Sequence, residues 1–245
     1  MDIRGKNTLV TGAGQGIGEA SAMMLAKNGA GKVVIVDINE PNLDRVAGAI
    51  EACGAKAIVK VCDVSETDNV IQLFNAAEAE TGGLDIVHNN AGIMTGEPDF
   101  PDTIMEKMIA VIQVNLLAMM VGTRQAIELM RTRSAAGVIV NTGSTAAFGP
   151  IMADPAYSTS KAGIVNFTQS CAPLKEAFNI RVMAVCPGMT DTAIVPHDAE
   201  WLQPALAASK LLQPEDIAAA VKKIIEDDST TGDYVIVAND PIQGQ

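Results

Sequence analysis

The chain has 245 residues, of which 48% are hydrophobic and 3% aromatic, and its formal net charge at pH 7 is −12. This length suits one large α/β domain with a sizeable aliphatic core, and the hydrophobic content excludes a disordered chain. The acidic balance keeps a protein soluble and argues against nucleic acid, anionic membranes and acidic carrier proteins as partners, because like charges repel.

The cysteines and the first residues bear on metal binding and compartment. Cys53, Cys62, Cys171 and Cys186 form no C-x-x-C pair, and the chain has two histidines, so we expect no metal site. The opening MDIRGKNTLVTG holds no apolar signal region, and no unbroken run of about 18 apolar residues predicts a transmembrane helix. We therefore expect a cytoplasmic protein.

Short apolar runs alternate with longer helical patterns along the chain. Strands are predicted at 8–10, 32–37, 56–62, 85–88, 137–141, 181–186 and 234–237. Helices are predicted at 16–28, 42–52, 66–80, 103–131, 157–178 and 214–226. This alternation predicts a Rossmann-type, doubly wound α/β fold, in which seven parallel strands carry helices on both faces within one domain over 1–245. The irregular stretch 189–213 is expected to be a substrate loop.

A glycine-rich turn, TGAGQGIG at 11–18, joins the first strand to the first helix. Such a turn aims backbone N–H groups and the helix dipole at one point, which makes an anion site. We expect a dinucleotide pyrophosphate there, held by Gly12, Gln15, Gly16, Ile17 and Gly18. The spacing G-x-x-x-G-x-G differs from G-x-G-x-x-G, and a plain structural turn remains the alternative.

The second strand ends in Asp37, 19 residues after Gly18. A carboxylate there accepts hydrogen bonds from ribose hydroxyls and repels a 2′-phosphate. Asp37 therefore favours NAD over NADP, as does the uncharged Gln15 in the turn, and we expect Ile38, the next residue, to contact the cofactor as well. The alternative is that Asp37 caps the next helix. The ends of the third and fourth strands complete the expected cofactor edge with Asp63, Val64, Asn90, Ala91 and Gly92.

Tyr157 and Lys161 are four residues apart in a predicted helix and therefore share one face. A nearby ammonium favours the phenolate, so Tyr157 could exchange a proton with an alcohol or ketone. Ser144, 13 residues before Tyr157, can bind the same substrate oxygen. Asn115 lies inside the long predicted helix although asparagine is a poor helix former. A lone Y-x-x-x-K arises often by chance; its conjunction with the glycine turn, Asp37 and NNAG makes it specific.

These motifs, in this order and over the whole chain, resemble the single-domain short-chain dehydrogenase/reductase family. They are TGAGQGIG at 11–18, CDV at 62–64, NNAG at 89–92, Asn115, Ser144, YSTSK at 157–161 and PG at 187–188. The resemblance implies that Tyr157 is the general acid/base, that Lys161 binds the nicotinamide ribose and lowers the tyrosine pKa, that Ser144 orients the substrate, and that Asn115 holds a water of a proton relay. It also implies cofactor contacts from Pro187, Gly188, Thr190 and Thr192.

Within the family the chain looks most like the NAD-dependent hydroxyprostaglandin-dehydrogenase-like branch, through VNLLAMMVGT at 114–123, CPGMTDTAI at 186–194 and IIEDDSTTGDYVIV at 224–237. Two departures stand out. Asp154 takes the place of a glutamine near the substrate oxygen, where an acid disfavours an anionic group. Pro173 interrupts the predicted helix 157–178, which in this family pairs between subunits together with 103–131.

The expected activity is hydride transfer between NAD and a hydrophobic secondary alcohol or its ketone. The expected substrate residues are Ser144, Asp154, Met94, Met152, Met189 and Trp201. The resemblance and the prevalence of symmetric assembly predict a homodimer or homotetramer. Two alternatives stay open: an NADPH-dependent 3-oxoacyl-carrier reductase, which Asp37 and the acidic charge oppose, and a catalytically inactive NAD-binding redox sensor, which the complete set of catalytic residues opposes.

Overall fold

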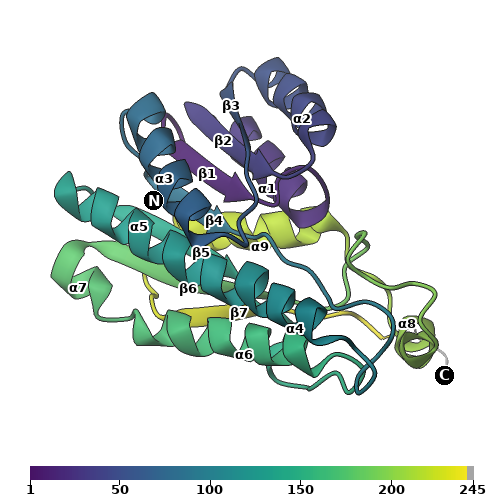
Figure 1. The fold of residues 1–245 in the computed structure, drawn as a ribbon. Helices are drawn as coiled ribbons and strands as arrows, with labels where there is room; N and C mark the ends of the chain where they lie inside the picture. Colours follow the sequence, from purple (N-terminus) through teal and green to yellow (C-terminus); the bar gives the residue numbers. More distant parts are fainter. Residues whose placement is uncertain (242–245) are drawn as a thin grey trace.

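A computed structural model describes residues 1–241, so the last four residues of the predicted 1–245 domain lie outside it. Its centre is a seven-stranded, all-parallel sheet in the order β3-β2-β1-β4-β5-β6-β7 (Figure 1). The strands are β1 Asn7–Thr11, β2 Lys32–Asp37, β3 Lys56–Val61, β4 Ile86–Asn89, β5 Gly137–Thr142, β6 Ile180–Pro187 and β7 Asp233–Val237. The predicted single-domain, doubly wound α/β fold is confirmed.

Helices cover both faces of this sheet (Figure 1). Alternate strand residues point to opposite sides, so Val10 and Ile35 pack in one core with the inner faces of α1 Gly16–Lys27, α2 Glu40–Ala52 and α9 Pro214–Glu226. Leu9 and Val34 pack in a second core with α3 Thr67–Thr81 and α5 Ala118–Thr132. Strand order reverses between β1 and β4, and open α/β sheets bind ligands at such a point.

The predicted helix 103–131 is three consecutive helical pieces. An α-helical turn, α4 Met105–Val111, leads into a π-helical turn, η1 Ile112–Leu117, and α5 then completes the run. Hydrophobic periodicity does not distinguish a π-turn from the α-helix around it, so this widening could not be predicted. Single π-turns in α-helices occur frequently at functional sites, and Asn115 lies within this one.

The predicted helix 157–178 is likewise divided. α6 spans Pro155–Ser170, and a separate short helix, α7 Leu174–Phe178, follows it. The break falls at Pro173, where sequence analysis expected a disturbance, because proline has no N–H to donate and its ring clashes with the preceding turn. α6 also begins earlier than predicted, since Pro155 occupies its first turn behind the N-cap residue Asp154.

The predicted substrate loop 189–213 contains a 3₁₀ turn, η3 Glu200–Leu202, and one short helix, α8 Gln203–Ala208. It leaves the end of β6 and leads into α9, and α8 stands beyond the carboxyl ends of the strands (Figure 1). The segment is therefore less irregular than its composition indicated.

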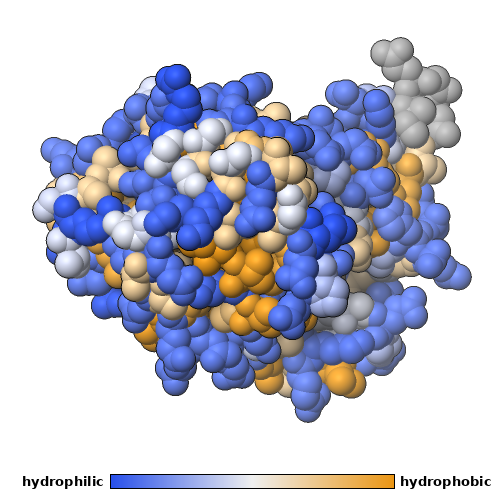
Figure 2. Space-filling view, turned by 90° about the horizontal axis from the view of Figure 1, so that it is seen from above, coloured by the Kyte–Doolittle hydropathy of each residue, from blue (hydrophilic) through white to orange (hydrophobic). Residues whose placement is uncertain are grey.

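The surface and the long helical run bear on the expected absence of a membrane span. Figure 2 shows one face on which hydrophilic residues surround a central gathering of hydrophobic ones. By length and composition, Met105–Thr132 is the one helix of residues 1–241 that could cross a bilayer, with 28% of its most apolar window buried. This helix was not predicted as a transmembrane candidate, because polar residues interrupt its apolar sequence. Its buried side chains Met119, Ala126 and Met130 face the protein interior.

Candidate active site

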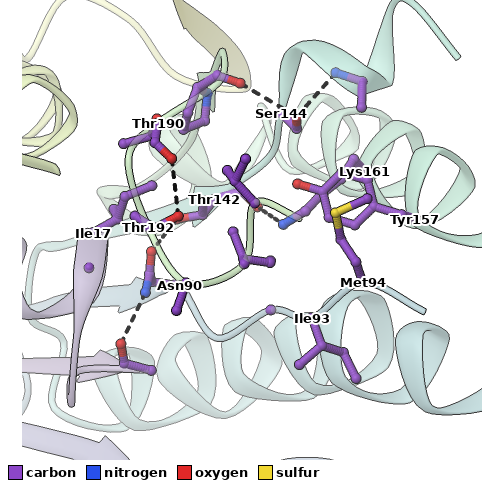
Figure 3. A pocket seen from close by; sticks show the side chains of 18 of the residues that line it. Ile17, Asn90, Ile93, Met94, Thr142, Ser144, Tyr157, Lys161, Thr190 and Thr192 are labelled. Carbon is purple, nitrogen blue, oxygen red and sulfur yellow. Dashed lines mark hydrogen bonds between the residues drawn. The ribbon is translucent and has the colours of Figure 1, made fainter. Parts of the chain in front are cut away.

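A cavity of about 890 Å³ opens at the carboxyl ends of the central strands (Figure 3). Most of the predicted site residues line it. On the cofactor side these are Gly12, Gln15, Gly16, Ile17, Asp37, Ile38, Asp63, Val64, Asn90, Ala91, Gly92, Pro187, Gly188, Thr190 and Thr192. On the catalytic and substrate side they are Ser144, Tyr157, Lys161, Met94, Met152, Met189 and Trp201. Gly18, Asn115 and Asp154 are predicted site residues that do not line the cavity.

The glycine-rich turn brings backbone close to backbone. A Cβ at Gly18 would lie 2.0 Å from the carbonyl oxygen of Gly12, which itself has a φ of +64°. Glycine is therefore required at both positions. The N-cap residue of α1, Gln15, makes no side-chain capping hydrogen bond, so the helix N-terminus is open toward the cavity. This arrangement suits an anion such as a pyrophosphate.

Asp37 supports the glycine turn from the neighbouring strand. Its Oδ2 accepts a hydrogen bond from the backbone N–H of Gly14 at 3.0 Å, and its Oδ1 accepts one from Asn39 at 3.0 Å. The cap of α2 is Asn39, whose side chain accepts from the N–H of Asn42. The open alternative that Asp37 caps the following helix is therefore wrong, and its carboxylate lies at the cavity wall.

A chain of hydrogen bonds crosses the strand ends beneath the cavity. The Thr142 hydroxyl donates to Asn90 Oδ1 at 3.2 Å, so His88 Nε2, 2.8 Å from that hydroxyl, acts as the donor. The Asn90 side-chain amide donates in turn to the carbonyl of Thr11 at 3.1 Å. Burial lowers the pKa of His88 to about 3, so its ring is neutral. Sequence reasoning missed Thr142, although its place at a strand end beside Gly143-Ser144 was a usable signal.

Tyr157 and Lys161 lie side by side in the cavity, with Ser144 on the adjacent segment (Figure 3). Lys161 Nζ is 5.5 Å from the centre of the Tyr157 ring and donates to the Thr142 carbonyl at 2.9 Å. Burial lowers the pKa of Lys161 to about 8. Burial also raises the pKa of Tyr157, a hydrogen bond with the Ser144 side chain opposes that rise, and the charge of Asp154 adds to it.

Burial dominates the electrostatics of Tyr157, because the desolvation of the phenol outweighs the groups around it and raises the pKa of Tyr157. That Lys161 lowers this pKa, as the resemblance implies, stays a prediction. A positive charge in the cavity, such as an oxidised nicotinamide ring, would favour the phenolate. Whether Tyr157 acts as the acid/base stays a prediction.

Asn115 lies behind the cavity and joins three segments. Its Oδ1 accepts from the backbone N–H of Ile93 at 2.8 Å, and its Nδ2 donates to the Ile93 carbonyl at 2.9 Å and to Ser160 Oγ at 3.1 Å. The side-chain amide thereby ties the η1 turn to the segment after β4 and to α6. The expected role of Asn115 in holding a water stays a prediction.

Asp154 is placed differently from its expected position beside the substrate oxygen. The side chain is 2% exposed and lies outside the cavity lining. One carboxylate oxygen accepts from the backbone N–H of Tyr157 at 2.9 Å as the N-cap of α6, and the other accepts from the N–H of Thr95 at 2.8 Å. Both oxygens are engaged because a helix N-terminus and a loop meet there, which the sequence pattern does not reveal.

The substrate side of the cavity is apolar. Met94, Met152, Met189 and Trp201 line it, and Met152 is 79% exposed at its rim. Sequence reasoning did not single out several further walls, which are Ile93, Ile151, Ile194, Val195 and Leu202. Three of these five lie in 189–213, so the prediction of a substrate loop was the signal that could have found them.

Comparisons with known proteins bear on this geometry. The sequence profile described as short chain dehydrogenase matches residues 6–203. The chain is 34% identical over 223 residues to a cis-4-hydroxycyclohexanecarboxylate dehydrogenase of Sinomonas cyclohexanicum, covering 89% of this chain and 88% of that protein. It is 32% identical to human 15-hydroxyprostaglandin dehydrogenase [NAD(+)], covering 95% and 90%. A Burkholderia cenocepacia short chain dehydrogenase in complex with NADP superposes with a TM-score of 0.87 at 30% identity, covering 97% and 98%.

Proposed function

From the premise that this chain belongs to the short-chain dehydrogenase family, as an oxidoreductase that acts on hydroxyl or keto substrates with a nicotinamide cofactor, we propose that it uses NAD and hydrophobic secondary alcohols or their ketones. The single observation that carries the proposal is the shared cavity. It joins the glycine turn and Asp37 at one side to Tyr157, Ser144 and an apolar wall at the other.

The cofactor side has the features that a dinucleotide requires. The cradle around Gly12 and Gly18 leaves no room for a Cβ, and the uncapped N-terminus of α1 suits the pyrophosphate. The Asp37 carboxylate has spare acceptor capacity beyond Gly14 and Asn39, and this supports binding of the ribose hydroxyls of NAD. The same charge opposes the 2′-phosphate of NADP.

When bound, nicotinamide accepts or supplies the hydride at the substrate carbon. Tyr157 then takes the hydroxyl proton of the alcohol through its phenolic oxygen, or returns it to the ketone oxygen in reduction. Ser144 donates a hydrogen bond to the same substrate oxygen and keeps it within reach of Tyr157. Lys161, anchored by the Thr142 carbonyl, holds positive charge near the phenol and favours the phenolate.

A second candidate, an NADPH-dependent 3-oxoacyl-carrier reductase, has one observation in its favour. The Burkholderia relative was crystallised with NADP. A guanidinium near the glycine turn could bind the 2′-phosphate of NADP. In this chain that group is Arg45, but it already donates to the Gly14 carbonyl and pairs with Glu19. An inactive redox sensor is less well supported, because Tyr157, Lys161 and Ser144 meet in one cavity.

The test is oxidation of a panel of apolar secondary alcohols with NAD or NADP, followed by the absorbance of reduced nicotinamide. We expect turnover with NAD, and Tyr157→Phe should lower kcat by about 10³-fold while the Kd for NAD changes little. The matched control is Tyr234→Phe, since Tyr234 is the other tyrosine of the chain and lies on β7.

Three results would contradict this proposal. Retained turnover in Tyr157→Phe removes the assigned acid/base. Tight NAD binding with no turnover of any alcohol or ketone favours the sensor instead, and a preference for NADP favours the reductase.

A further inference from the structure

We propose that the substrate side of this cavity selects uncharged molecules and rejects carboxylates, because its apolar wall offers no spare cation and the segments that supply this wall are strongly acidic. The inference deepens the proposed function and rests on its assignment of the two sides of the cavity. It separates this chain from its relative in Sinomonas cyclohexanicum, whose printed name describes a carboxylate substrate.

The wall itself holds no partner for an anion. In the part of the chain that the structure describes, the charged residues lining the cavity are Asp37, Asp63 and Lys161. The two aspartates lie on the cofactor side, and the Lys161 ammonium is already bound to the Thr142 carbonyl. A substrate carboxylate beside Met94 or Ile151 would lose its water without gaining an ion pair, and this desolvation opposes its binding.

A negative charge is also buried immediately behind the catalytic tyrosine. Asp154 binds the backbone N–H groups of Tyr157 and Thr95, and its charge is felt by the phenol, whose pKa it raises. No ion pair of Asp154 is found among residues 1–241. Asp154 therefore has no ion-pair partner of its own, and its charge disfavours a second anion nearby.

Three segments, 93–104, 144–156 and 189–213, supply the substrate-side lining, and the acids that they carry beside those lining residues in the chain are called the acidic rim. The first lies against the second, since the backbone N–H of Phe100 donates to the Ala153 carbonyl at 2.9 Å. Together they hold Asp154 and six exposed acids, which are Glu97, Asp99, Asp102, Asp191, Asp198 and Glu200. Lys210 is their one lysine or arginine, so seven carboxylates against one ammonium leave a net charge of −6.

This charge is concentrated. Half of the −12 of the whole chain lies in these 50 residues, whereas Glu106 and Lys107 at the start of α4 cancel one another. Clusters of one sign around a low-dielectric cleft change local ligand concentrations by about 10-fold or more, and salt screens the effect because the Debye length falls from about 30 Å at 0.01 M to about 8 Å at 0.15 M. An acidic rim therefore predicts rejection of anions that weakens with salt.

The first measurement needs no turnover. Trp201 is the one tryptophan of the chain and lines the substrate side, so its fluorescence reports binding there. With the protein saturated with NAD, we would titrate cyclohexanecarboxylate, its methyl ester and its amide. We expect the ester and the amide to bind at least about tenfold more tightly than the acid at 10 mM ionic strength, with the gap narrowing severalfold in 0.5 M NaCl.

A variant in which three rim carboxylates are replaced by neutral amides tests the rim itself. In Glu97→Gln/Asp99→Asn/Asp102→Asn the ratio of acid to amide affinity should rise severalfold at low salt. The matched control, Glu51→Gln/Glu128→Gln/Glu176→Gln, removes the same number of exposed charges from α2, α5 and α7 and should leave the ratio unchanged. Because both variants are read as a ratio of two ligands, a general loss of stability does not imitate the expected result.

The inference would be overturned if cyclohexanecarboxylate bound as tightly as its amide at low salt, or if the methyl ester did not bind. An affinity difference between acid and amide that changes neither with salt nor in the rim variant would also overturn it, since desolvation at the apolar wall alone would then explain the preference. If the ligands bind as expected while no alcohol is oxidised, the proposed activity fails and the charge selection stands.

Discussion

The two sides of the cavity are built in different ways. On the cofactor side, strand ends and backbone contacts leave little freedom. Gly18 lies close to the Gly12 carbonyl, Asp37 accepts a hydrogen bond from the Gly14 N–H, and Asn90 donates one to the Thr11 carbonyl. On the substrate side, methionines and aliphatic side chains from loops form the wall, and Met152 is largely exposed. The predicted cofactor and catalytic residues therefore lie at or beside a rigid sheet edge, whereas the predicted substrate wall lies on loops with adaptable side chains.

Two residues join the sides. Asp154 holds the first turn of α6, which carries Tyr157, against the loop that carries Met94, and Asn115 ties the π-turn to Ile93. The comparison therefore predicts large effects for changes at the sheet edge and small ones at the loop walls, with the following substitutions ordered accordingly.

Gly18→Ala should have the largest effect. Its Cβ would meet the Gly12 carbonyl oxygen at 2.0 Å and Asn90 Nδ2 at 2.7 Å, so the turn must move. We expect NAD affinity to fall by more than about 100-fold, measured by calorimetry, and the free energy of unfolding to fall by about 1–3 kcal/mol. Gly48→Ala is the matched control, because a Cβ there meets nothing within 4 Å in α2, and it should stabilise by about 0.5–1 kcal/mol. Equal NAD affinity in both variants would show that the turn is not a cofactor cradle.

Lys161→Met should lower kcat for oxidation by about 10²-fold and move the rising limb of kcat against pH to higher pH. The sign follows from charge: burial already raises the pKa of Tyr157, and removing a neighbouring ammonium raises it further, so more base is needed to form the phenolate. The measurement is kcat against pH with saturating NAD. Lys175→Met, on α7, is the control, and an unshifted profile in Lys161→Met would remove the lysine from the mechanism.

Asp37→Asn should reduce the preference for NAD over NADP by about tenfold, measured as the ratio of kcat/KM for the two cofactors. The amide oxygen can still accept from Gly14, so the turn is kept while the charge is lost. Asp44→Asn, exposed on α2, is the control. A ratio that stays constant would leave Asp37 with only its role in supporting the turn.

Substitutions at the loop wall should have the smallest effects. Met152→Ala, at a side chain that is 79% exposed, should change KM for an apolar alcohol by less than about threefold. Trp201→Ala should change it more, by about tenfold, since an aromatic ring contributes more contact area. A Met152 effect larger than the Gly18 effect would contradict the contrast between the two sides.

The sequence predicted much of the site because its motifs fall at strand ends. In a parallel sheet the carboxyl ends of strands meet at one edge, so Asp37, Asn90 and Ser144 could be placed together from chain order alone. Side-chain partners could not be placed this way. Asp154 was expected beside the substrate oxygen, but a helix start and a loop meet at its carboxylate and take both oxygens.

What the sequence determined by itself is local and periodic. Alternating apolar runs and helical patterns specified the seven strands and both helical layers, and glycine spacing specified a turn in which Gly12 and Gly18 leave no room for a Cβ. What the tertiary structure decided depends on contacts between distant segments. The hydrogen bonds of Asn115 in the π-turn and of Thr142 reach partners dozens of residues away, and the raised pKa of Tyr157 follows mainly from burial. Periodicity records which side of an element is apolar, but it carries no information about which distant group will meet that side.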